Sequence, residues 1–225
     1  MFVSKSMTRK VITVGPDAGI LEASDLMTRH GIRHLPVVQP ERRLIGIVTD
    51  RDIRSSLPPS HLPGSDSEET RRRVAGLKVQ DIMTRDPVAV SPNDTLQDVL
   101  LLIQKIRVGA FPVVDAGGIL KGIISVRDLL RAFINVLGIG EPGTLLGILV
   151  EDRVGQMKKI VDAVTEEEIS FGSILVARYW EEGKRAVFPY LLTNNVAPVK
   201  RKLQQMGYTL IDPMEWYLDQ LPQHE

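Results

Sequence analysis

Two short motifs in this 225-residue chain place a hydroxyl side chain three residues before an aspartate. They are Thr49-x-x-Asp52 and Ser125-x-x-Asp128, and each follows a run of β-branched residues that begins with glycine. In a structural interpretation, the hydroxyl caps a helix and the carboxylate accepts a hydrogen bond from the N-cap amide. In a functional one, the carboxylate accepts hydrogen bonds from a ribose while the helix N-terminus faces a phosphate. The spacing alone favours the capping box, and the two are compatible because a ligand can replace a cap.

The two motifs belong to an internal repeat with a fixed offset of 76 residues. Between positions 3 and 53, 15 of the 51 residues are identical to the residue 76 positions later, without a gap. Chance identity would be several times lower, so the chain contains a duplication. The identities include Met7-Thr8-Arg9, Pro36-Val37-Val38, Gly46-Ile47 and Arg51-Asp52.

Each copy predicts the element order β-α-β-β-α. The first strand stops at a proline, and apolar residues then recur at helical spacing. Gly31 lies where a left-handed cap would end this helix in copy one. The last helix is short and opens at Thr49 or Ser125. One such unit is too small to bury a good core, so we expect the copies to pack on each other. The predicted strands cover residues 11–14, 35–38 and 44–48 in copy one and 88–90, 111–114 and 120–124 in copy two.

The segments GIRHLPVV with LIGIVTDRDI, and VGAFPVV with LKGIISVRDL, resemble the two halves of a CBS-domain pair, the Bateman module. The resemblance implies an α+β fold in which two repeats pack as a pseudo-twofold pair. Repeat 1 would span residues 1–54, a linker 55–78 and repeat 2 79–134. In this family the aspartate typically holds the ribose of an adenosine nucleotide, so the resemblance implies AMP, ADP, ATP or S-adenosylmethionine as a regulatory ligand and no cofactor.

The family shares each site between the two copies, which implies two unequal sites here. Arg33 and His34 stand where the family often places phosphate-binding cations, whereas copy two has Gly109 and Ala110. We therefore expect the second site to be weaker, degenerate or specific for a less charged ligand. A solvated loop remains the alternative for Arg33 and His34. The main site would comprise Lys10, Val11, Ile12, Arg33, His34, Pro36, Ser125, Arg127 and Asp128, and the second Thr49, Arg51, Asp52, Pro87, Val88, Gly109, Ala110 and Pro112.

The segment between the copies is rich in proline and serine over residues 55–67, which predicts a surface connection. The sequence EETRRR at residues 68–73 predicts an added helical turn. Its arginines could form a phosphate patch, although a solvated charge run is the more common arrangement.

After Phe133 the repeat stops, and the glycines and proline of residues 135–143 predict a hinge. Residues 144–213 predict β-α-β-β-α-β, the split ferredoxin-like order, before a tail over 214–225. The turn from Glu151 to Met157 resembles that of ACT domains, although Val154 replaces the usual proline. This resemblance implies dimerisation and a small effector near Asp152, Arg153 and Gly155. Self-association without a ligand is the open alternative.

The whole order, a CBS pair followed by a hinge and an ACT-like end, is similar to the acetoin-utilisation AcuB family. It implies a regulatory homodimer connected with acetoin catabolism. A nucleotide that bridges the two copies would shift the population toward the conformation with a closed interface, and the ACT-like end or a partner would respond to that change. The alternative is an interaction module that binds no ligand and only assembles a larger complex.

Composition excludes several other classes of function. Lys plus Arg equals Asp plus Glu, 28 against 28, so no overall field attracts nucleic acid or an anionic membrane. Cysteine is absent, which removes thiol nucleophiles and thiolate metal sites. Glycines and Pro142 interrupt the most apolar stretch, residues 133–150, and no signal peptide precedes it, so we expect a cytoplasmic protein. The four histidines are scattered and no nucleophile elbow or phosphate loop occurs, so we expect neither a metal site nor an enzyme.

Overall fold

A computed structural model of the chain describes residues 1–57 and 67–211. The chain divides after Leu130 into two compact units. The proline- and serine-rich part of the predicted linker, residues 58–66, and the predicted tail, residues 214–225, lie outside the described residues.

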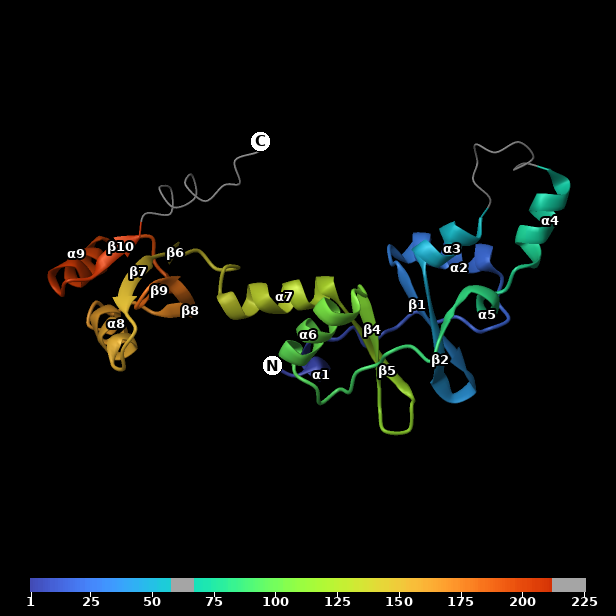
Figure 1. The fold of residues 1–225 in the computed structure, drawn as a ribbon, viewed down its shortest axis with the longest axis horizontal. Coiled ribbons are helices and arrows are strands. Elements are labelled where there is room, and N and C mark those ends of the chain that lie inside the picture. Colours follow the sequence, from blue (N-terminus) through green and yellow to red (C-terminus); the bar gives the residue numbers. More distant parts are fainter. Residues whose placement is uncertain (58–66, 212–225) are drawn as a thin grey trace. The chain divides into compact units, whose positions relative to one another are not determined.

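The first unit contains both copies of the repeat up to Leu130, in the last helix of copy two, and its α+β composition is as predicted (Figure 1). The last helix of copy two is longer than expected and runs into the segment assigned to a hinge. Copy one and the segment after it contain α1 (Val3–Ser6), α2 (Ile20–His30), β1 (His34–Gln39), β2 (Arg43–Thr49), α3 (Asp50–Ser56) and α4 (Glu68–Gly76). Copy two contains α5 (Val79–Ile82), β3 (Thr84–Arg85), α6 (Leu96–Ile106), β4 (Ala110–Val114), β5 (Leu120–Ser125) and α7 (Val126–Leu137).

The two antiparallel hairpins repeat each other residue by residue. In β1–β2, His34 lies opposite Thr49, and in β4–β5, Ala110 lies opposite Ser125. Both hairpins shift register at the second valine of Pro-Val-Val, Val38 in one copy and its counterpart in the other. This register places the first residue of each hairpin beside the residue that caps the helix following it.

The strands predicted at residues 11–14 and 88–90 are wrong. Each segment pairs through one residue only, Val14 with Val37 and Val90 with Val113, as isolated parallel bridges. The valine amide donates to the proline carbonyl of the hairpin, for example Val14 N–H to the carbonyl of Pro36 at 3.1 Å. In copy two, Pro87 has no amide hydrogen to extend such a ladder.

The two copies exchange their first segments. Thr84 of copy two pairs with Ile47 of β2, and Thr8 of copy one pairs with Ile123 of β5. In the same way α5 lies beside copy one and α1 beside copy two (Figure 1). The side chains of Met83 and Met7 fill the space above Gly46 and Gly122, respectively. The exchange explains why these methionines and glycines recur at the 76-residue offset.

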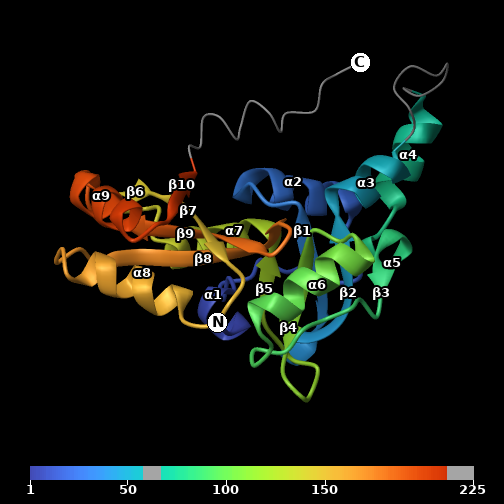
Figure 2. The ribbon, with the colours of Figure 1, turned by 60° about the vertical axis from the view of Figure 1, so that its left-hand side comes forward.

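The second unit has the order β-α-β-β-α-β after one short added strand. Its sheet is antiparallel, with the order β10-β7-β9-β8, and β6 pairs with the end of β9 (Figure 2). Both helices pack on one face, where Ile148, Ile160, Val187 and Leu203 are fully or almost fully buried. The elements are β6 (Thr144–Leu145), β7 (Gly147–Glu151), α8 (Gln156–Thr165), β8 (Phe171–Glu181), β9 (Lys184–Leu191), α9 (Ala197–Gln205) and β10 (Thr209–Ile211).

Among the described residues, no helix is both long and apolar enough to cross a lipid bilayer.

Candidate functional site

A cavity of about 510 Å³ lies between the two copies of the repeat. Copy one contributes the start of β1 and the junction of β2 with α3, and copy two contributes the segment before α6 and the start of β4. Four arginines and two aspartates face it together with apolar side chains. The lining residues are Arg33, His34, Ile47, Thr49, Asp50, Arg51, Asp52, Arg54, Thr84, Pro87, Val88, Ile106, Arg107, Val108, Gly109, Ala110, Phe111 and Pro112.

Asp52 forms a capping box at the N-terminus of α3, as the spacing predicts. Its Oδ2 accepts hydrogen bonds from the amide of Thr49 at 2.8 Å and from the Thr49 hydroxyl at 2.6 Å. Its Oδ1 has no hydrogen-bond donor within residues 1–57 and 67–211. One carboxylate oxygen therefore holds the helix terminus while the other can accept hydrogen bonds from a ligand in the cavity.

Asp128 forms the equivalent capping box with Ser125 but is more enclosed. Its Oδ2 accepts from the Ser125 amide at 2.9 Å and from the Ser125 hydroxyl at 2.6 Å. Its Oδ1 also accepts a hydrogen bond from the hydroxyl of Thr8 at 3.3 Å, and the residue is 7% exposed. The two aspartates thus have the same local geometry and different surroundings.

His34 reaches from copy one to the backbone of copy two. Its ring lies so close to Gly109 that a Cβ there would be 3.1 Å from Nε2. Burial lowers the pKa of His34 below its ordinary value, and the nearby charge of Arg33 lowers it further, while the charge of Asp52 acts in the opposite direction. His34 is therefore predominantly neutral at pH 7 and can both donate and accept a hydrogen bond.

The CBS domain family matches residues 3–58 and 79–135, which make up just over half of the chain. The chain belongs to the CBS domain family. Its first unit is accordingly called the CBS pair below.

Curated relatives match the CBS pair within proteins of different lengths. A CBS domain-containing protein of Dictyostelium discoideum is 31% identical over 137 residues, which cover 61% of this chain and 94% of that protein. An inosine-5'-monophosphate dehydrogenase of Korarchaeum cryptofilum is 36% identical over 121 residues, 54% of this chain. This match spans only 22% of the length of the dehydrogenase.

Solved structures of three similar proteins share the fold of the CBS pair. AcuB of Vibrio cholerae, named for acetoin utilization, is 28% identical with a TM-score of 0.52 and covers 63% of this chain and 98% of its own. CBSX2 of Arabidopsis thaliana, solved with AMP, is 27% identical with a TM-score of 0.50, covering 59% and 96%. The CBS pair of protein MJ0100, solved with 5'-methylthioadenosine and S-adenosyl-L-methionine, is 26% identical with a TM-score of 0.50, covering 59% and 95%.

The CBS pair distributes the predicted site residues differently from the expectation. Every residue assigned to the second site lines the cavity, but so do Arg33 and His34, which were assigned to the site of Asp128. The register explains the difference: His34 lies opposite Thr49, and the carbonyl of Arg33 accepts a hydrogen bond from the Asp50 amide at 3.1 Å. The remaining residues of the predicted main site, Lys10, Val11, Ile12, Pro36, Ser125, Arg127 and Asp128, do not line this cavity.

Sequence comparison missed two arginines that line the cavity of the CBS pair. Arg54 lies one turn into α3 and makes an exposed ion pair with Asp50 at 2.8 Å. Arg107 follows the last residue of α6 and corresponds to Gly31 at the 76-residue offset. The replacement of a helix-capping glycine by arginine was the signal in the sequence that could have revealed Arg107.

A second cavity, of about 460 Å³, lies in the unit that follows the CBS pair. Asp152, Arg153 and Gly155, the residues of the predicted effector turn, all line it. Arg185 pairs with Asp152, and the Nε of Arg185 is buried without a hydrogen-bond partner among the described residues. Gly155, with φ of 96°, precedes α8. Within the described parts of the chain, no three His, Asp or Glu side chains gather as a metal site would require.

Proposed function

We propose that this chain is a regulatory protein rather than an enzyme, and that its CBS pair binds an adenosine nucleotide in the cavity that holds Asp52. The observation that carries the proposal is Oδ1 of Asp52, which accepts no hydrogen bond from residues 1–57 or 67–211 and shares one cavity with Arg33, His34 and Arg51. The complexes of CBSX2 with AMP and of MJ0100 with S-adenosyl-L-methionine support this class of ligand.

The chemistry of the cavity suits each part of such a ligand. Asp52 accepts hydrogen bonds from ribose hydroxyls, and the arginines neutralise the phosphate. Apolar side chains, among them Ile47, Val88 and Phe111, provide a surface for the purine. Because both copies contribute, a bound nucleotide joins them and stabilises the conformation in which they lie together.

The site around Asp128 is the second part of the proposal, with Lys10, Val11, Ile12, Ser125 and Arg127 as its further residues. A ribose that binds Asp128 must compete with the Thr8 hydroxyl for Oδ1. The sequence ranks this site first because of Arg33 and His34, whereas their place in the Asp52 cavity supports the opposite ranking.

Isothermal titration calorimetry with AMP, ADP, ATP and S-adenosylmethionine tests the function and the ranking together. We expect Asp52→Ala to lose the tightest binding event and Asp128→Ala to retain it. The reverse result would return the main site to Asp128. Absence of binding and of any thermal shift with all four compounds would support the alternative, an interaction module without a ligand.

We also propose that the second unit is a ferredoxin-like, ACT-like domain that binds a small effector. Its strand order β10-β7-β9-β8 and the cavity at Asp152, Arg153 and Gly155 support this. Thermal shift against a panel of amino acids and other small carboxylates is the test, with Arg153→Ala as the matched variant. A panel that produces no shift would leave self-association as the role of this unit.

A homodimer and a place in acetoin catabolism complete the proposal. Leu101 on α6 and Leu130 on α7 are 65% and 59% exposed, which supports a surface covered by a second copy. Sedimentation velocity of Leu101→Glu and Leu130→Glu tests the homodimer, since we expect both variants to be monomers.

The similarity to AcuB supports a place in acetoin catabolism. Unchanged growth on acetoin after deletion of the gene would contradict it.

A further inference from the structure

The two long helices of the CBS pair end in the same backbone conformation with different residues. Gly31, after α2, has φ 62° and ψ 34°, and Arg107, after α6, has φ 61° and ψ 38°. These left-handed angles suit glycine, whereas a Cβ makes them unfavourable. Copy two therefore keeps an arginine where copy one has the residue that the backbone prefers.

No contact within the described fold accounts for this arginine. The Arg107 amide donates to the carbonyl of Ile103 at 2.8 Å, a bond that any residue except proline could make. Its side chain is exposed and makes no hydrogen bond or ion pair to residues 1–57 or 67–211, although it lines the Asp52 cavity. A strained residue whose side chain faces a cavity rather than the fold points to a role toward a ligand.

The position of Arg107 also compensates for a difference between the copies. Copy one contributes Arg33 and His34 to the cavity, and their counterparts, Gly109 and Ala110, carry no charge. Arg107, two residues before Gly109, is a cation of copy two that lines the same cavity. Cations from both copies thus surround one space.

We propose that Arg107 binds the phosphate of the nucleotide in the Asp52 cavity and sets the preference for phosphorylated ligands. The inference rests on the proposed nucleotide site and assigns recognition of the phosphate charge to the guanidinium of Arg107. A planar guanidinium provides paired donors for phosphate oxygens, and Arg33 approaches the same anion from the other copy. The ligand is then held by charge from both copies at once.

The test is Arg107→Gly, which installs the residue of copy one. Because glycine relieves the left-handed strain, we expect the melting temperature to stay constant or rise, so lost binding cannot reflect misfolding. By calorimetry at low salt, we expect the dissociation constants of AMP, ADP and ATP to rise at least about fivefold and that of adenosine to stay unchanged. Arg107→Lys should retain part of the affinity.

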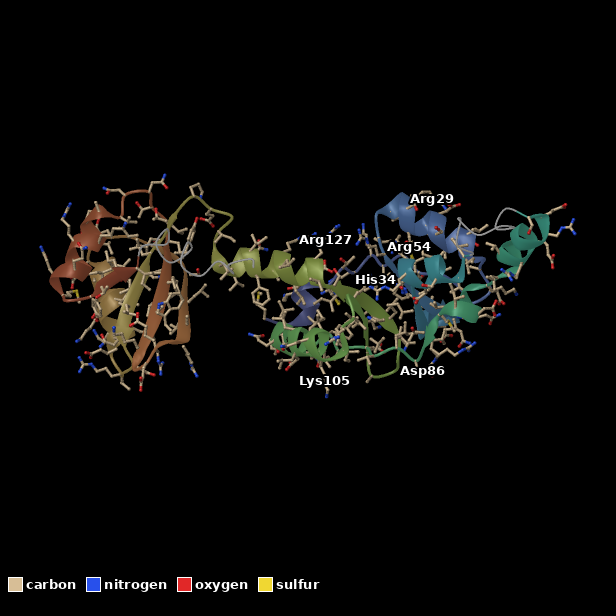
Figure 3. All side chains as sticks on the ribbon, turned by 45° about the horizontal axis from the view of Figure 1, so that its top comes forward. Arg29, His34, Arg54, Asp86, Lys105 and Arg127 are labelled. Atoms are coloured by element: carbon tan, nitrogen blue, oxygen red, sulfur yellow. The ribbon has the colours of Figure 1, made fainter. Side chains whose placement is uncertain are left out.

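Lys105→Ala is the matched control, since Lys105 is a cation in the last turn of α6, two residues before Arg107. Its side chain extends away from the helix (Figure 3) and does not line the cavity. We expect this variant to bind AMP, ADP and ATP as the unmodified protein does. If the unmodified protein binds nucleotides and Arg107→Gly binds them equally well, the role of Arg107 is overturned and the nucleotide site stands. If the unmodified protein binds neither adenosine nor its phosphates, both proposals fail.

Discussion

The imidazole of His34 rests against Gly109, where a Cβ would lie 3.1 Å from Nε2 and 3.2 Å from Cε1. The two residues come from different copies of the repeat, and Gly109 is the counterpart of Arg33. Because Gly109 has no side chain, the ring of His34 can occupy the space beside it. In the sequence, Gly109 stands where copy one has the cation Arg33. In the structure, the same glycine allows His34 to lie in the cavity.

Gly109→Ala tests this contact. We expect the added methyl group to displace the His34 ring and to weaken AMP binding several-fold, while far-UV circular dichroism stays unchanged. Gly15→Ala is the control, because a Cβ at position 15 would meet no atom within 4 Å. Equal AMP affinity of both variants would show that the placement of His34 does not matter for the site.

A second aspartate, Asp98, allows the capping role of Asp52 to be tested separately from its role in binding. Asp98 forms the same capping box with Thr95, at 2.9 Å from the amide and 2.6 Å from the hydroxyl, and does not line the cavity. We expect Asp52→Asn and Asp98→Asn both to lower the melting temperature, since each weakens a helix cap. Only Asp52→Asn should lose nucleotide affinity in calorimetry. A similar loss in Asp98→Asn would mean that the effect is structural.

His34 predicts a decline of stability in mild acid. Burial lowers its pKa in the folded protein, so between the usual value near 6.5 and the lowered value the unfolded chain binds the proton and the folded protein does not. The free energy of unfolding should therefore fall as the pH drops below about 6.5 and level off below the folded pKa. Urea denaturation at several pH values measures this change. The free energy of unfolding should depend less steeply on pH in His34→Gln than in the control His30→Gln, which removes an exposed histidine of α2.

Because the two copies exchange their first segments, equivalent substitutions in the two copies should destabilise the fold in the same way. A Cβ at Gly46 would lie 2.5 Å from Sδ of Met83, and one at Gly122 would lie 2.6 Å from Sδ of Met7. We expect Gly46→Ala and Gly122→Ala each to lower the free energy of unfolding by about 1–3 kcal/mol, as overpacking does. Chemical denaturation measures the change, and Met83→Ala should partly rescue Gly46→Ala. Unchanged stability in both variants would contradict the close packing of the exchanged segments.

The sequence determined whatever depends on short-range periodicity. The duplication, the helices α2 and α6, both hairpins and the capping boxes of Asp52 and Asp128 follow from residues close together in the chain. The left-handed cap at Gly31 was predicted for the same reason. The first strands were wrong because Val14 and Val90 each pair at a single residue, and alternation alone cannot show how far a ladder extends.

The tertiary structure alone decided which residues share a cavity. That Arg33 and His34 lie beside Asp52 depends on the register of β1 with β2, and that Arg107 joins them depends on how α6 and β4 pack against copy one. The exchange of Met7-Thr8 and Met83-Thr84 between the copies likewise leaves no local pattern. Contacts between residues that are distant in sequence form only when the whole unit buries its core, so the spacing of two motifs shows which residues repeat and not which of them meet.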